Sequence, residues 1–160
     1  MKKEQGFSLI ELLIVVAIIL IIAAIAIPNL MRARMSANEA SAAGSIRSIN
    51  TGEVSYASTY PAVGFSSLSV LGPNANPCTP SNTNGCFIDQ VLAAGTKEGY
   101  TFTAVPTNAV GGINMGFAST GDPSNLNTTG TRSFCSDQTG VIYYLSGATG
   151  CTAATGSVLQ

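Results

Sequence analysis

Few side chains in this chain are of the kinds that catalyse reactions or hold metal ions. The 160 residues include no histidine, so the commonest general base and metal ligand is missing. Carboxylates are sparse, and Asp89, Asp122 and Asp137 are spaced as turn or cap residues. The sequence has no glycine-rich phosphate loop and no serine or cysteine with a histidine partner. We therefore expect no enzyme, no catalytic residue, no cofactor and no metal.

The other reactive groups are four cysteines, at positions 78, 86, 135 and 151. They form no Cys-x-x-Cys pairs, which disfavours a zinc site, and their even number favours disulfides formed outside the cytoplasm. Cys78 and Cys86 bracket a polar cluster, and a Cys135–Cys151 bridge would fasten the C-terminal tail to a strand. Of the three possible connectivities we favour Cys78–Cys86 with Cys135–Cys151.

One carboxylate lies where a charge is unfavourable. Glu11 stands within GFSLIELLIVVAIIL, and sixteen consecutive apolar residues follow it, from Leu12 to Ile27. A helix over residues 7–27 would measure about 32 Å at about 1.5 Å per residue, enough to cross a hydrocarbon core of about 30 Å. Lys2 and Lys3 precede the run and favour a cytoplasmic N-terminus. The sequence predicts one membrane span, with the rest of the chain exported.

The overall charge disfavours nucleic acid as a partner. The formal net charge is −1, and the basic residues cluster only at Lys2-Lys3 and at Arg32-Ala33-Arg34. A nucleic-acid groove needs a concentrated positive face. Binding of nucleic acid is therefore unsupported by the charge pattern.

A cleaved secretory signal peptide is the alternative interpretation of the N-terminus. Lys2-Lys3, the apolar run and Ala24-Ile25-Ala26 resemble the three regions of such a peptide. Against it, the run exceeds the usual length of about 7–15 residues, contains Glu11 and continues into helix-compatible sequence beyond Pro28.

The junction Lys3-Glu4-Gln5-Gly6-Phe7-Ser8-Leu9-Ile10-Glu11 resembles the class III signal of type IV pilins and pseudopilins. That signal has a short basic leader, glycine before the cut, phenylalanine after it and glutamate four residues further on. Pro28 also falls where this family has a proline. The resemblance is close over residues 1 to about 35 and extends to the rest of the chain only in layout.

The resemblance implies a role for each residue of the junction. A prepilin peptidase would cut between Gly6 and Phe7 and methylate the new amine of Phe7. Glu11 would then be an assembly determinant that pairs with the Phe7 amine of a neighbouring subunit. The alternative is a glutamate that simply reaches the lipid headgroups.

The expected fold is α+β and pilin-like, with a long N-terminal helix packed on about four antiparallel strands. We expect a leader at 1–6, a helix at 7–60 and a β domain with loops at 61–160. The helix divides into an apolar part, 7–27, and an amphipathic part, 28–60. A kink is expected at Pro28. Helical spacing predicts a buried stripe at Ala42, Ile46, Ile49, Glu53, Tyr56 and Tyr60. Alternation and turn residues predict a short helix over 87–92 that ends at Gly95, strands over 100–105, 113–118, 132–136 and 141–145, and a tight hairpin link over 137–140.

The resemblance implies a structural subunit, most simply the major pilin of a type IV pilus that serves adhesion, twitching motility or DNA uptake. Its partners would be other copies of itself in a helical polymer, the prepilin peptidase, an inner-membrane assembly platform and an outer-membrane secretin. It would sit in the inner membrane with its globular part in the periplasm, and afterwards in the extracellular pilus. The alternatives are a pseudopilin of a type II secretion system and a membrane-tethered monomeric binding domain.

Overall fold

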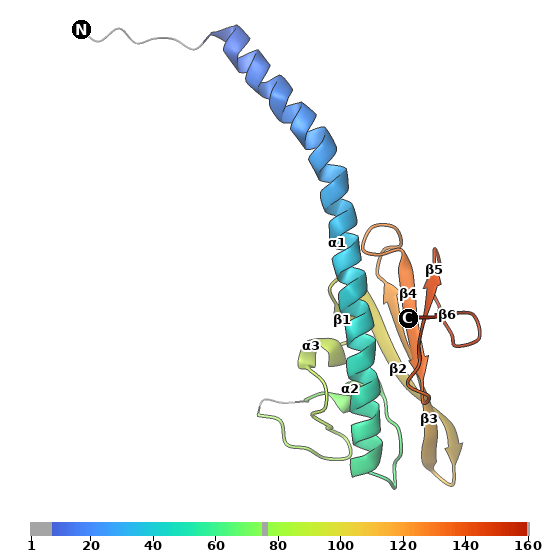
Figure 1. Cartoon of the computed structure of the whole chain (residues 1–160). Coiled ribbons are helices and arrows are strands. Elements are labelled where there is room, and N and C mark those ends of the chain that lie inside the picture. The colour runs from blue at the N-terminus through green and yellow to red at the C-terminus, as the bar shows by residue number, and fades with distance from the viewer. Residues whose placement is uncertain (1–7, 75–76, 160) are drawn as a thin grey trace. The chain divides into compact units, whose positions relative to one another are not determined.

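The computed structural model describes residues 8–74 and 77–159. These residues form a long helix, two short helices and a sheet (Figure 1). The elements are α1 (Leu9–Thr59), α2 (Leu68–Leu71), α3 (Gln90–Ala93), β1 (Thr96–Lys97), β2 (Tyr100–Val110), β3 (Ile113–Pro123), β4 (Arg132–Asp137), β5 (Ile142–Ser146) and β6 (Ser157–Val158). The chain divides into two compact units between Arg34 and Met35, and α1 contributes to both.

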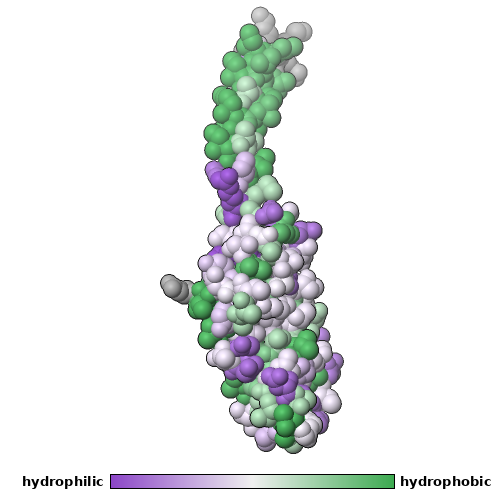
Figure 2. Space-filling view, turned by 90° about the vertical axis from the view of Figure 1, so that its right-hand side faces the viewer, coloured by the Kyte–Doolittle hydropathy of each residue, from purple (hydrophilic) through white to green (hydrophobic). Residues whose placement is uncertain are grey.

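The part of α1 in the first unit is an apolar helix whose side chains are exposed. Among the described residues, α1 is long and apolar enough to cross a membrane. Its leucine, isoleucine and valine side chains gather on the surface seen in Figure 2. The helix continues through Pro28, whose ring removes one backbone donor. The kink expected at that residue stays a prediction.

The second unit contains a six-stranded antiparallel sheet in which every strand neighbours the next one along the chain. We expected about four strands, and the two additional ones, β1 and β6, have two residues each. A two-residue strand is too short to leave an alternating pattern in the sequence. The expected class, a long helix packed on an antiparallel sheet, is confirmed.

The hairpin of β2 and β3 is longer than the sequence predicts. Its register runs from Tyr100 opposite Pro123 to Val110 opposite Ile113. The connecting Gly111 and Gly112 both have positive φ, 62° and 86°, as a type I′ turn requires. The outer half of the hairpin is mostly exposed on both faces. The alternation of apolar and polar residues therefore fades there, and the predicted strand over 100–105 stopped short. The strand predicted over 113–118 missed the inner end of β3, because the buried positions there are occupied by Ser119, Gly121 and Pro123, which are not large apolar residues.

The core forms where one stripe of α1 meets the sheet and the short helices. Of the predicted stripe, five residues are buried and Tyr60 is partly buried. The stripe packs with Phe102 and Ala104 of β2 and Phe134 of β4. Leu71 of α2 and Leu92 of α3 complete this cluster. The periodicity of the helix thus identified the face that packs on the sheet.

The connections differ in how far they were predictable. The link between β4 and β5 is a tight turn, as expected, in which Asp137 Oδ1 accepts hydrogen bonds from the amide and hydroxyl of Thr139 at 2.9 and 2.6 Å. The short helix expected over 87–92 begins later, at Gln90, because Asp89 caps it by accepting from the Leu92 amide at 2.9 Å. The expectation that Asp122 is a turn or cap residue was wrong: it lies in β3, opposite Thr101.

Glu39 joins α1 to the start of β4 through both of its carboxylate oxygens. Oε1 accepts from the amide and hydroxyl of Thr131, each at 2.7 Å, and Oε2 accepts from Nε and Nη2 of Arg132 at 2.8 and 2.7 Å. Arg132 also lies over the rings of Phe134 and Tyr144, at 5.8 and 5.7 Å from their centroids. Burial by itself raises the pKa of Glu39, but the bonds from Thr131 and Arg132 outweigh it, so the pKa lies below its usual value.

Replacing two glycines of α1 by alanine should change the stability of the fold in opposite directions. A Cβ at Gly44 would meet no atom within 4 Å, whereas a Cβ at Gly52 would lie 2.9 Å from Cγ2 of Ile88. Gly44→Ala should raise the free energy of unfolding by up to about 1 kcal/mol through helix propensity. Gly52→Ala should lower it by about 1 kcal/mol or more through overpacking. Urea unfolding of the full chain in detergent micelles would measure both, and equal effects would contradict the packing described here.

Glu39→Gln should lower the free energy of unfolding by about 2–3 kcal/mol, because the variant loses a charge-assisted bond and leaves Arg132 without its carboxylate. In the wild type, the stabilisation is present above pH 4.5, the unfolded value, and is lost as pH falls through the lower folded pKa. The control is Glu98→Gln, the same substitution at an exposed residue. Unfolding curves of Glu39→Gln and Glu98→Gln that coincide would rule out this contribution.

Candidate functional site

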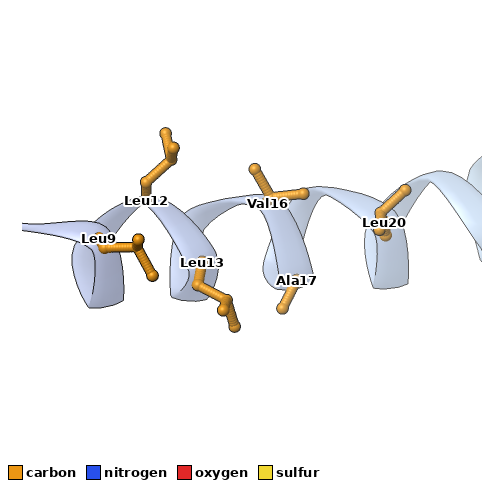
Figure 3. A pocket seen from close by; sticks show the side chains of 6 residues that line it. All are labelled: Leu9, Leu12, Leu13, Val16, Ala17 and Leu20. Carbon is orange, nitrogen blue, oxygen red and sulfur yellow. The ribbon is translucent and has the colours of Figure 1, made fainter.

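The candidate site is the exposed apolar surface of α1 with the single carboxylate at its beginning. Six side chains line a shallow strip along one side of the helix, from Leu9 to Leu20 (Figure 3). They are Leu9, Leu12, Leu13, Val16, Ala17 and Leu20. The strip is built by one helix and is open to its surroundings, so it is a surface for packing and not an enclosed pocket.

The degree of exposure along this helix sets what must surround it. Leu9 is 78% exposed and Val16 is 45% exposed, and the apolar residues between them fall within this range. At about 25 cal/mol per Å² of apolar surface, water is a poor environment for a helix of this kind. Lipid chains or other apolar helices are therefore the surroundings in which this segment is stable.

Glu11 lies in the first turn of α1 and has a local hydrogen-bond partner. Its Oε2 accepts from the backbone amide of Ser8 at 3.1 Å. A carboxylate at this place is favoured by the partial positive charge of the helix N-terminus. One amide does not neutralise the carboxylate. Gly6 and Phe7, the residues expected to flank the cleavage, lie outside the described residues, so the cleavage, the methylation and the role of Glu11 stay predictions.

A second unusual carboxylate, Glu53, lies in the predicted stripe of α1. Its side chain is fully buried, and its Oε2 accepts from the backbone amide of Ser66 at 3.0 Å. Burial raises the pKa of Glu53 to about 7, although the bond from Ser66 acts in the opposite direction. The sequence placed Glu53 on the buried face but gave no signal of its partner, because Ser66 is an ordinary serine in a loop.

The cysteines pair as Cys78–Cys86 and Cys135–Cys151. The first bridge closes the polar loop that precedes α3. The second joins β4 to the segment before β6, and both of its cysteines are buried. Loops of these lengths restrict the unfolded chain and so stabilise the second unit, by about 3 kcal/mol for a loop of about 15 residues.

The remaining acidic residues hold local structure. Asp89 caps α3 and forms an ion pair with Lys97 at 3.1 Å, and Asp122 accepts from the Gly150 amide at 2.9 Å. Within residues 8–74 and 77–159, no three cysteine, aspartate or glutamate side chains gather as metal ligands would.

Comparison with known proteins places the similarity at the N-terminus. The model of the prokaryotic N-terminal methylation motif matches residues 1–27. The type IV wide pilus major component PilA4 of Thermus thermophilus is 62% identical over 39 residues, which cover 24% of this chain and 30% of that protein. The type IV major pilin protein PilA of Myxococcus xanthus is 43% identical over 54 residues, which cover 34% of this chain and 24% of that protein.

The matched regions thus span about a quarter to a third of these relatives. No solved structure matches the chain significantly. The match to the methylation motif includes Gly6, Phe7 and Glu11, which carried the resemblance in the sequence. The chain thus carries the prokaryotic N-terminal methylation motif and is similar at its N-terminus to two type IV major pilins, and its long apolar helix continues into a helix-on-sheet unit.

Proposed function

We propose that this chain is the major structural subunit of a type IV pilus and has no enzymatic activity. The observation that carries the proposal is the exposed apolar part of α1 with Glu11 in its first turn. Such a helix is stable first in the inner membrane and then among the same helices of other copies. The names of the two relatives, both major pilus components, support this choice over a minor subunit.

Cleavage of the leader creates a positively charged amine that can pair with the carboxylate of Glu11. The prepilin peptidase cuts between Gly6 and Phe7 and methylates the new amine of Phe7. A carboxylate near the middle of a bilayer costs about 2.5–3.5 kcal/mol on insertion scales. Pairing with the Phe7 amine of a neighbouring subunit offsets this cost and fixes the axial register of the two helices.

The remaining partners follow from the same proposal. The subunit waits in the inner membrane as a single-pass protein with the second unit in the periplasm. An inner-membrane platform adds it to the filament, which leaves the cell through an outer-membrane secretin. The two disulfides are consistent with a second unit that folds outside the cytoplasm. Adhesion, twitching motility and DNA uptake are the roles that such a filament serves.

A pseudopilin of a type II secretion system is the second candidate, because it would share the processing and the anchored helix. Deletion of the gene distinguishes the two. Loss of surface filaments with secretion intact supports the pilin, whereas loss of secretion with filaments intact would overturn it.

Mass analysis of protein sheared from cell surfaces tests processing and export together. The expected chain begins at methylated Phe7, because the peptidase cuts after Gly6. A chain that begins at Ile27 or Pro28 would instead establish an ordinary signal peptide and refute the proposal.

Glu11→Ala tests the role of the carboxylate in assembly. The variant should be cleaved and methylated normally but should reduce the yield of sheared filaments at least tenfold, because it cannot pair with the amine of a neighbouring Phe7. Glu98→Ala, at an exposed residue of the second unit, is the matched control and should assemble normally. A normal filament yield with Glu11→Ala would eliminate the pairing and would favour a monomeric domain that uses α1 only as a tether.

A further inference from the structure

The segment that follows α1, residues 60–66, connects the helix to the outer part of β3; we call it the strap. Asn114 of β3 holds it with three hydrogen bonds. The Asn114 amide donates to the carbonyl of Val63 at 2.9 Å, its Nδ2 donates to the carbonyl of Phe65 at 2.8 Å, and its carbonyl accepts from the Phe65 amide at 3.1 Å. Gly64 has a φ of 78°, and a Cβ there would lie 2.1 Å from the Asn114 carbonyl oxygen. The close approach of the strap to β3 therefore requires glycine at position 64.

The strap reaches α1 through Glu53. The Ser66 amide, at the end of the strap, donates to Oε2 of Glu53 at 3.0 Å, and Ser66 itself is only 7% exposed. Among the described residues, Oε1 of Glu53 has no hydrogen-bond partner although it is buried. One amide is far from sufficient to stabilise a buried ionised carboxylate, whose full solvation needs several donors.

No lysine or arginine lies close to Glu53 along the chain, and burial and the Ser66 bond are the causes that act on its pKa. Between Arg47 and Lys97 the sequence contains no lysine or arginine. On α1 itself, the other titratable groups from residue 48 onward are Tyr56 and, just after the helix, Tyr60. The strap with α2, over residues 61–72, and the hairpin, over residues 105–119, contain no titratable or charged side chain. The segment before α3, whose Ile88 packs beside Gly52 of α1, contributes Asp89, which is paired with Lys97. The surroundings of Glu53 thus favour its neutral form.

We propose that Glu53 is a proton-sensitive latch, whose neutral carboxyl keeps the strap closed between α1 and β3 and whose ionised form loosens it. Because Asn114 belongs to the hairpin, opening of the strap also frees the outer part of β2 and β3. That part exposes Val105, Val110 and Met115, which are 56%, 67% and 59% exposed. Protonation of Glu53 thereby controls how well ordered the exposed apolar surface of the outer hairpin is.

The direction of the effect follows from linkage. In the closed state the pKa of Glu53 is raised to about 7, whereas a glutamate in contact with water titrates near 4.5. The closed state therefore binds the proton more tightly, and opening becomes easier as pH rises between these two values. The opening equilibrium should rise by about tenfold per pH unit between pH 5 and pH 6.5 and should level off above pH 7.5.

Hydrogen exchange of the full chain in detergent micelles, followed by mass spectrometry from pH 5 to pH 8.5 and corrected for intrinsic exchange rates, tests the latch. In the wild type, protection of peptides from residues 60–68 and 105–117 should fall as described, while a peptide from β4 should keep its protection. Glu53→Gln should abolish this pH dependence, because its amide does not ionise. Glu98→Gln, the matched exposed control, should behave as the wild type does.

Two outcomes would overturn the proposal: a wild type whose strap protection does not change with pH, or a Glu53→Gln variant that keeps the wild-type pH dependence. If Glu53→Gln does not fold, ¹³C NMR of the wild-type glutamate carboxyls decides. A Glu53 carboxyl that titrates near pH 7 supports the latch, and one that titrates near pH 4.5 refutes it.

Discussion

The whole structure depends on one helix that must satisfy two different environments. In its first part α1 presents apolar side chains in every direction, so that lipid or other apolar helices must surround it. In its second part a single stripe is apolar and packs against the sheet. The same continuous backbone serves both needs because hydrogen bonds within the helix satisfy its polar groups in either environment. What changes along α1 is the distribution of side chains.

The second unit shows how a buried carboxylate can be stabilised or left sensitive to pH. Glu39 and Glu53 both lie on the buried side of α1, fourteen residues apart. Glu39 receives two donors from Thr131 at Oε1 and two from Arg132 at Oε2, and therefore remains ionised and joins α1 to β4. Burial raises the pKa of Glu53, and the single bond from the Ser66 amide does not offset it. Burial raises the pKa of both carboxyls, and the donors outweigh it at Glu39 but not at the more deeply buried Glu53.

The sequence predicted the elements that depend on neighbours along the chain. Helical spacing identified the buried stripe, and alternation located the four principal strands. Prediction from the sequence failed for elements that leave no local pattern of residues. β1 and β6 are too short for a pattern, α2 has no cap hydrogen bond from its serine, and the outer hairpin has no buried face to impose alternation. Asp122 was misassigned to a turn because aspartate is common in turns, whereas here it accepts from Gly150, 28 residues away.

The sequence by itself determined the apolar helix, the junction that resembles that of type IV pilins, the buried stripe and the main strands. These features arise from the types and spacing of residues within a few turns or one strand. Only the tertiary structure decided which hydrogen-bond partners the polar groups inside the second unit have. Glu39 meets Thr131 across 92 residues, and Asn114 meets Phe65 across 49. Such contacts depend on which strands become neighbours, and no local period in the sequence encodes them.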